Sequence, residues 1–428
     1  MLFADQTAET VAPQAGLMTD AFLSLGTLAP TPSDMYFGYH MRVAGAGPDL
    51  ARLRSHVARR IDRVPLLTHR LTVRDRHAAW EPDPAFDVDH HVRLAPGTGL
   101  EARPAQELLD FPVDEARPRW GLWVHRGDGR AWALTYLAHH AVQDAMTMLD
   151  TLRILLGAGE LPVAPAIPVA PTPRREKITG ILPLVPGVLS TYLPRAASPK
   201  FPTPDPVAGR TLGQASVEVQ VLRSIADATG STVNQVHLAA LTMALRSWSV
   251  TRESLTRPRW RNGPHLVVPV DTRRGTEQTQ HPPYGNHIGL LRLSVPRSAD
   301  DLTKTLAAIA PSTSRRRMAR SRAALRTLNE YAPRRLASWA MRRVTDPRGL
   351  LLTASNVRCP APLTAMGDEV TEVTAVPWLP PGSGCFTLLV TYRGVARLSV
   401  LSGAVSADPG ALASLWARSL TRERGIPG

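Results

Sequence analysis

The stretch that decides the fold reads Ala131-Trp-Ala-Leu-Thr-Tyr-Leu-Ala138 and continues into His139-His-Ala-Val-Gln-Asp-Ala145. Its first part is an almost uninterrupted apolar run, which is typical of a strand buried on both faces. From Val142 to Leu156 the apolar side chains return at roughly helical spacing, so a helix is predicted to follow. Ligands of open α/β sheets bind beyond the carboxyl ends of strands. The polar residues between these two elements are therefore expected to face a crevice.

Three roles fit the adjacent histidines His139 and His140 with the nearby Asp144. An imidazole with an ordinary pKa of about 6.5 suits a general base when a neighbour fixes its tautomer, and Asp144 in a first helical turn can orient the loop or an arginine. A buried, hydrogen-bonded structural pair fits equally well. A metal site would add Asp150, but neighbouring strand residues face opposite ways and no third His or Cys lies at ligand spacing, so no metal is predicted.

A second histidine pair, His90-His91, follows Asp87-Val88-Asp89 inside an alternating pattern. The alternation over Val88–Leu94 predicts a strand, and no acid follows at the spacing seen after His140. We interpret this pair as structural.

The whole chain has the composition of a large globular protein. It has 428 residues, of which 43% are apolar and 20% charged, which excludes disorder as the default. Twelve of its 39 prolines lie between Pro162 and Pro206, a density that predicts a connector without regular structure. The chain is therefore expected to divide into a first half at 1–157, a crossover at 158–206 and a second half at 207–428.

Helices and strands alternate in both halves, which favours a layered α/β protein. Further helices are predicted at Asp49–Ile61, Ser224–Thr229 and Thr232–Ser249, and further strands at Leu71–Trp80, Trp120–His125, His265–Val270, Ile288–Val295, Cys385–Tyr392 and Arg397–Leu401.

The formal net charge is +14, and much of it is concentrated between Arg315 and Arg343, a segment that contains ten arginines and one acidic residue. Two basic amphipathic helices separated by Pro333 are predicted there. This basic segment has three interpretations: a solvated face, a surface for anionic lipid or an acidic carrier protein, and a nucleic-acid site. Nucleic acid is disfavoured, since Tyr331 and Trp339 are the only aromatic residues in the segment.

The cysteine content and the hydropathy of the chain indicate the cellular compartment in which the protein is expected. Two cysteines cannot form a disulfide framework, and no apolar run of about 18 residues or secretory signal is present. We expect a cytoplasmic protein, with peripheral contact to an anionic membrane through the arginine-rich segment as one option.

The His139–Ala145 segment resembles the HHxxxDG motif of the CoA-dependent acyltransferase superfamily, which includes condensation domains. Four further segments, in family order, resemble blocks of the bacterial wax ester synthase/diacylglycerol acyltransferase family. They are Phe111–Trp120, Thr232–Ala239, Val268–Pro296 and Ser355–Gly394.

The resemblance implies two chloramphenicol-acetyltransferase-like αβα halves with mixed sheets, joined by a crossover, and an active-site tunnel at their interface. The implied reaction moves an acyl group from acyl-CoA or an acyl carrier protein to an alcohol, or more rarely an amine, without a further cofactor. His140 would be the general base, and His139 and Asp144 would hold its geometry, with the aspartate paired to an arginine.

The same resemblance implies the residues that bind substrate. Ser355 and Asn356 are candidates for hydrogen-bond donors to the thioester oxygen, and Asn234 and Asn286 for residues that line the tunnel. The matched blocks add Gln235 and Trp120. A helix cap for Asn234 and turn positions for Asn286 and Asn356 are equally compatible with the sequence.

The sequence also departs from the family pattern. Ala145 stands in place of the motif glycine, Arg119 in place of a leucine, and Gln235 and His237 in place of Asp and Val. A diverged condensing enzyme that forms an ester or amide in natural-product biosynthesis, and a non-catalytic homologue that binds a lipid or carrier, therefore stay as alternatives.

Overall fold

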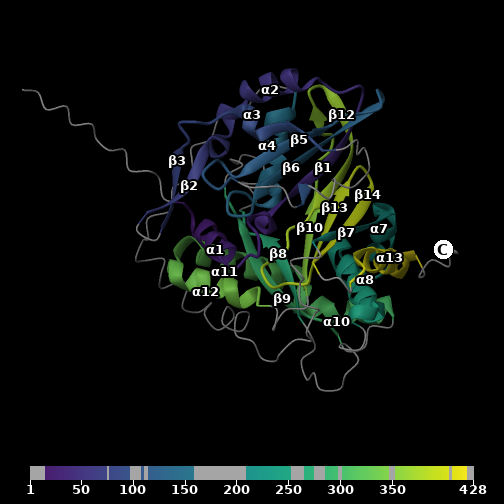
Figure 1. Cartoon of the computed structure of the whole chain (residues 1–428). Coiled ribbons are helices and arrows are strands. Elements are labelled where there is room, and N and C mark those ends of the chain that lie inside the picture. The colour runs from purple at the N-terminus through teal and green to yellow at the C-terminus, as the bar shows by residue number, and fades with distance from the viewer. Residues whose placement is uncertain are drawn as a thin grey trace, which may run out of the picture.

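The computed structural model describes residues 15–74, 77–96, 108–109, 114–158, 209–251, 265–273, 285–296, 301–346, 352–403 and 407–421. Two six-stranded mixed sheets with helices packed around them form the body of the protein (Figure 1). This arrangement confirms the layered α/β prediction. The crossover predicted at 158–206 lies, from residue 159 onward, outside the described residues.

The first sheet has the order β11-β12-β1-β6-β5-β4. Its centre is the predicted buried strand, β6, in which all nine residues are buried, and which pairs antiparallel with β1 and β5. The strands are β1 (Tyr36–Ala44), β4 (Val92–Leu94), β5 (Trp120–His125), β6 (Ala131–His139), β11 (Thr364–Ala365) and β12 (Asp368–Val376).

Strands β11 and β12 belong to this first sheet although they lie far along the chain. Strand β12 pairs antiparallel with β1, with Gly38 opposite Val376 and Val43 opposite Val370. The same strand also packs against β13 and β14 of the second sheet (Figure 1). The sheets are therefore not divided at residue 207, and this strand joins the two halves.

The second sheet has the order β7-β14-β13-β10-β8-β9. Strand β10 runs parallel to β8 and β13, and the other pairs are antiparallel. The predicted hairpin of β13 and β14 is confirmed, with Arg393 and Gly394 both at positive φ in its tight turn. The strands are β7 (Thr211–Glu218), β8 (His265–Asp271), β9 (Ile288–Ser294), β10 (Leu352–Arg358), β13 (Cys385–Tyr392) and β14 (Val395–Ser402).

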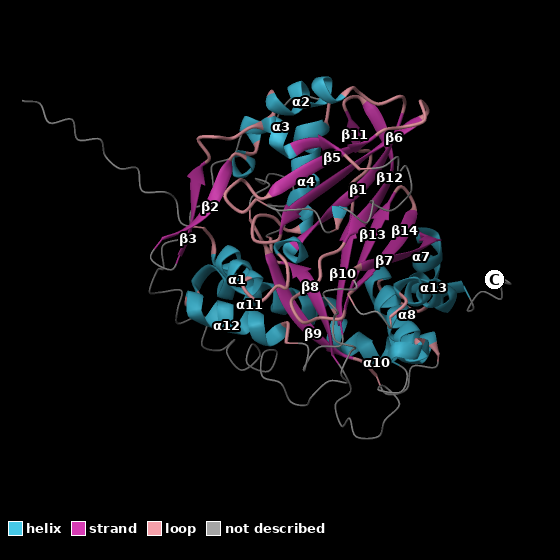
Figure 2. Ribbon diagram, in the orientation of Figure 1, coloured by secondary structure: helices cyan, strands magenta, loops and turns pink. Residues whose placement is uncertain are grey.

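The helices form two groups around the second sheet (Figure 2). One group packs together beside β7 and β14, and consists of α7 (Val219–Ala228), α8 (Val233–Ser247), α10 (Leu302–Thr313) and α13 (Pro409–Thr421). The other group consists of α1 (Leu17–Gly26), α11 (Arg315–Tyr331) and α12 (Arg334–Val344), with α1 packed on α12. The two basic helices separated by Pro333 are thereby confirmed. Helices α2 (Leu50–Ala58) and α4 (Ala145–Leu156) lie beside the first sheet.

Two local predictions were wrong. Val88–Leu94 is a short helix, α3 (Val88–His91), followed by β4, because the Asp87 side chain accepts a hydrogen bond from the Asp89 amide and caps a helical turn. Leu71–Trp80 is not one strand but part of a hairpin of β2 (His69–Arg74) and β3 (His77–Pro82).

Within the part of the chain that the structure describes, no helix combines the length and the apolar character that a membrane-spanning segment needs.

Candidate active site

Asp144 joins the histidine loop to helix α4. Strand β6 ends at His139, and Asp144 is the N-cap of α4. Its carboxylate accepts hydrogen bonds from the Thr147 amide at 2.9 Å and the Thr147 hydroxyl at 2.8 Å. The side chain thereby satisfies a helix N–H that has no partner within the helix.

The same carboxylate forms a buried ion pair with the second half of the chain. Arg273, just after β8, places Nη2 2.9 Å from both carboxylate oxygens, and the His287 amide donates at 2.7 Å. Burial opposes ionisation of Asp144, but the Arg273 charge, His287 and their hydrogen bonds outweigh burial and hold the pKa of this carboxyl well below its usual range. Asp144 therefore stays charged and ties the two sheets together.

His140 is buried and has a defined tautomer. The Nδ2 of Asn286 donates to the His140 carbonyl oxygen at 2.6 Å, which directs Oδ1 of the amide toward Nδ1 of His140 at 3.1 Å. An amide oxygen only accepts hydrogen bonds, so Nδ1 carries the proton and Nε2 keeps its lone pair. Burial lowers the pKa of His140 to about 4, although Asp144 and Asn286 act in the opposite direction. The imidazole is thus neutral at physiological pH.

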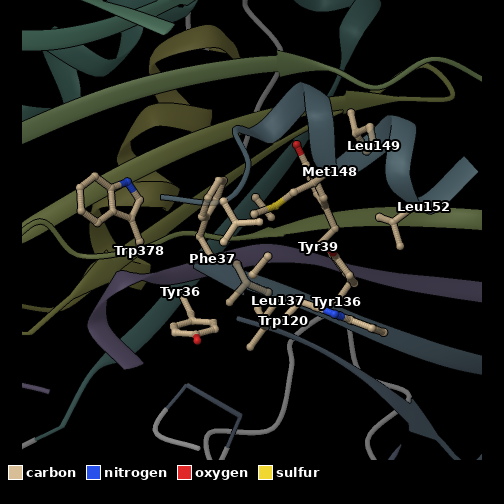
Figure 3. Packing of buried hydrophobic residues seen from close by; sticks show 14 of the residues in the cluster. Tyr36, Phe37, Tyr39, Trp120, Tyr136, Leu137, Met148, Leu149, Leu152 and Trp378 are labelled. Carbon is tan, nitrogen blue, oxygen red and sulfur yellow. The ribbon is translucent and has the colours of Figure 1, made fainter. Parts of the chain in front are cut away.

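Aromatic rings surround the His140 imidazole. Phe22 and Phe37 stack on it with ring centroids 3.9 and 4.4 Å away, and Trp378 meets it edge-on at 4.8 Å. Figure 3 shows Phe37 and Trp378 among the buried residues of this core. A small, mostly apolar cavity of about 50 Å³ lies against these rings. Its other lining includes Ser355, Met341 and Leu388.

His139 faces another environment. Its Nδ1 accepts a hydrogen bond from the Ala141 amide at 2.9 Å, and burial together with the Arg119 charge holds its pKa well below the usual range. The ring lines a second, larger pocket of about 890 Å³. Because the two histidines line different cavities, they do not converge on one ion. Among the described residues, no group of three or more His, Cys, Asp or Glu is placed to hold a metal.

The larger pocket carries excess positive charge. It lies between α1 and α12 and is lined by four arginines and two acids. Asp20 pairs with Arg334, and Glu115 lies 3.4 Å from Arg119. The other two arginines, Arg335 and Arg342, belong to α12 and are exposed. Arg342 donates a hydrogen bond to the Ser24 hydroxyl at 2.8 Å.

The candidate oxyanion donors Ser355 and Asn356 lie on opposite sides of β10, as alternation along a strand requires. Ser355 lines the His140 cavity. Asn356 is exposed, and its Nδ2 donates to Oδ1 of Asn234 at 2.9 Å. Asn234 and Asn356 therefore contact each other, and neither lines the cavity. Asn286 contacts His140 directly.

Gln235 and Trp120 make structural contacts in this structure. Gln235 forms a capping box with Thr232 at the start of α8. The indole N–H of Trp120 donates to the Leu67 carbonyl at 2.8 Å, and its ring stacks on His91 at 4.5 Å. Neither side chain lines the cavity at His140.

Sequence reasoning missed the aromatic rings around His140 and did not identify which arginine pairs with Asp144. Phe22, Phe37 and Trp378 come from three distant segments, and no local pattern signals that they meet. The chain has many arginines, so the partner Arg273 could not be selected from the sequence.

Comparisons with known proteins agree with this architecture. Residues 35–181 match the wax ester synthase/diacylglycerol acyltransferase catalytic domain, and residues 284–422 match the C-terminal domain of the same family. Together the two matches take in more than half of the chain.

Curated relatives share part of the chain. A Mycobacterium tuberculosis protein named "Putative diacyglycerol O-acyltransferase" is 29% identical over 210 residues, which cover 40% of this chain and 44% of the relative. A Mycobacterium bovis protein of the same name is 27% identical over 277 residues, covering 55% and 53%. The chain thus spans about half the length of the curated relatives it matches.

Solved structures share the fold over nearly the whole chain. The wax ester synthase/diacylglycerol acyltransferase from Marinobacter aquaeolei VT8 has a TM-score of 0.62 at 18% identity, covering 96% of this chain and 100% of that one. A starter condensation domain of rhizomide synthetase in complex with C8-CoA has a TM-score of 0.65 at 15% identity, covering 96% and 93%. These neighbours confirm the predicted two-half, chloramphenicol-acetyltransferase-like fold. By its two domain matches, the chain belongs to the bacterial wax ester synthase/diacylglycerol acyltransferase family.

Proposed function

We propose that the protein transfers an acyl group from a thioester to a hydroxyl acceptor and forms an ester, with His140 as the general base. The observation that carries this proposal is the His140 imidazole itself, which is neutral, buried beside a cavity, and held by Asn286 in the tautomer that leaves Nε2 free to accept a proton.

The reaction balances with these groups. The acceptor oxygen attacks the thioester carbon while its proton passes to Nε2 of His140. When the carbon–sulfur bond breaks, the thiolate leaves and takes that proton back, so the imidazole ends neutral. Asp144 and Arg273 do not exchange protons in this sequence, and their ion pair holds the loop that carries His140.

The donor is an acyl-CoA or an acyl carrier protein, both of which carry phosphate groups. The pocket beside His139 supports this choice, since Arg335 and Arg342 offer it exposed positive charge close to the histidine pair. The rhizomide synthetase neighbour, whose structure contains C8-CoA, is consistent with such a donor. His139 is the last residue of β6 and His140 follows it directly, so the charged pocket and the His140 cavity adjoin the same strand end.

Two alternatives have specific support. The fold likeness to condensation domains favours an enzyme that joins specialised metabolites as an ester or amide. Ala145, in place of the motif glycine, favours a homologue that binds a lipid or carrier without turnover.

Peripheral membrane contact is a separate part of the proposal. Helix α11 exposes Arg315, Arg316, Arg317, Arg320 and Arg322, and α12 exposes Leu336 and Trp339, whose relative exposures are 46% and 39%. Basic side chains beside exposed apolar ones suit an anionic bilayer surface. Co-sedimentation with vesicles containing anionic lipid, and none with neutral vesicles, is the expected result.

The test of the proposed function is a product assay. The purified full chain is incubated with acyl-CoAs of several lengths and with panels of alcohols, diacylglycerol and amines, and both thiol release and product mass are measured. Ester formation supports the proposal. Amide products alone would favour the condensing enzyme, and binding of acyl-CoA without any thiol release would favour the non-catalytic homologue.

A further inference from the structure

Trp378 carries a buried donor that has no partner. The residue is 5% exposed, and its indole Nε1 has no hydrogen-bond acceptor among the described residues. A buried N–H without an acceptor costs free energy, so such a group in a folded protein calls for an explanation.

The surroundings of this indole are apolar. Its ring lies 5.8 Å from Phe22 and 6.0 Å from Phe386, measured between ring centroids, and it lines the same cavity as His140. In Figure 3 the indole nitrogen lies on the side of the ring that faces Phe37. Ring faces compensate a buried N–H only weakly. A strong acceptor placed in this cavity would therefore satisfy a donor that the protein leaves open.

The proposed reaction creates such an acceptor. Attack on a thioester moves negative charge onto the carbonyl oxygen, and that oxygen must lie close to His140, because His140 removes the proton of the attacking group. Asn356 cannot stabilise this charge, because it lies on the far side of β10. Four other side chains that line the cavity carry an O–H or N–H: Thr345, Thr353, Ser355 and Trp378. The Thr345 hydroxyl already donates to the Met341 carbonyl, whereas the indole N–H of Trp378 has no acceptor among the described residues.

The backbone around Trp378 favours a fixed position. The residue lies between β12 of the first sheet and β13 of the second, and Pro377, Pro380 and Pro381 flank it closely. Proline restricts φ, so this connection between the sheets has few conformations available. A donor held in place before the reaction stabilises developing charge without the cost of reorientation.

We propose that the indole N–H of Trp378 donates a hydrogen bond to the carbonyl oxygen of the acyl thioester and stabilises the oxyanion formed when the acceptor attacks. This inference rests on the proposed function. The indole keeps its proton throughout: the acceptor proton passes to His140, the oxyanion collapses, and the thiolate leaves with that proton.

The first test is Trp378→Phe, which keeps an aromatic ring and removes the N–H. We expect kcat to fall about 100-fold, the size seen when one oxyanion donor is removed, while KM for the acyl thioester changes less than about threefold. Trp416→Phe is the matched control, because it removes a buried indole N–H in α13 that lines neither pocket, and the folded variant should keep both constants unchanged. A Trp378→Phe variant with the kcat of the wild type would overturn the proposal.

A second variant covers the case in which Trp378→Phe does not fold. Replacement of Trp378 by 3-benzothienylalanine exchanges only the N–H for sulfur and keeps the size of the ring. The same loss of kcat supports the proposal, and an unchanged kcat overturns it. If the wild-type chain transfers no acyl group, both the proposed function and this inference are contradicted. If the wild type is active and both variants keep its kcat, only the inference about Trp378 is overturned.

Discussion

The two adjacent histidines lie in contrasting surroundings. His140 lies among Phe22, Phe37 and Trp378 beside a small apolar cavity, and its Nδ1 is held by Asn286. His139 lines a pocket about 890 Å³ in volume with four arginines in its walls. His139 is the last residue of β6 and His140 is the first residue after it, and their side chains line different cavities. In the proposed function, His140 provides a neutral base in the small cavity, and the pocket beside His139 binds the anionic part of the donor.

The largest effect is expected at His140 itself. His140→Ala should lower kcat about 10³-fold, because among the described residues it removes the only imidazole that lines the apolar cavity, while the Asp144–Arg273 pair keeps the loop in place. His139→Ala should lower kcat far less, and its main cost should be stability. Both variants are checked for folding by circular dichroism. If they lose kcat equally, the two histidines do not have the different roles proposed here.

The second-largest effect is expected on stability, at the ion pair between Asp144 and Arg273. Asp144→Asn leaves Arg273 buried without its full partner and should reduce the free energy of unfolding by about 3 kcal/mol. Asp89→Asn is the control, since that carboxylate pairs with Arg54 at the surface with 57% of its side chain exposed, and should cost less than about 1 kcal/mol. Denaturant titration of both variants measures the difference. Similar costs would show that the buried pair does not join the halves.

A smaller effect is expected on the His139 side. The double variant Arg335→Ala/Arg342→Ala should raise KM for acyl-CoA about tenfold and leave KM for an acyl N-acetylcysteamine thioester, which has no phosphate, unchanged. Arg316→Ala/Arg317→Ala, on the exposed face of α11, is the matched control. Steady-state kinetics with both donors checks this, and an equal rise for the two donors would exclude phosphate recognition in the pocket.

The smallest effect is expected in the pH dependence. An imidazole accepts a proton only when it is neutral, and burial lowers the pKa of His140 to about 4. The value of kcat/KM should therefore change less than about twofold between pH 8 and pH 6 and fall only as the pH approaches 4, within the range where the chain stays folded. An ordinary histidine would already lose half of this value near pH 6.5. A midpoint near 6.5 would contradict the buried neutral base.

Local patterns predicted much of the fold. The apolar run of β6, the helical spacing of α4 and the break at Pro333 are each decided within a short window of sequence. The pairing of β12 with β1 joins segments more than 300 residues apart, and no local period encodes it. The Asp87 cap overrode an alternating pattern at α3 because four residues are too few for periodicity to decide.

The candidate site was predictable in its loop and less so in its surroundings. The sequence placed His139, His140 and Asp144 between a strand and a helix, as the structure does. The side chains of Ser355 and Asn356 point to opposite sides of β10, as alternation along a strand requires, so this difference could be predicted from the sequence. The ring contacts of Trp378 were not, because they depend on how two sheets are joined in space.

The most direct test of the central claim is chemical rescue of His140→Ala. Acyl transfer by the folded variant is measured with and without added imidazole, by ester formation from acyl-CoA and an alcohol. If the His140 imidazole is the base, the variant should lose nearly all transfer, and free imidazole should restore part of it with a pH dependence that follows the pKa of imidazole. Full transfer by His140→Ala without imidazole would contradict the account.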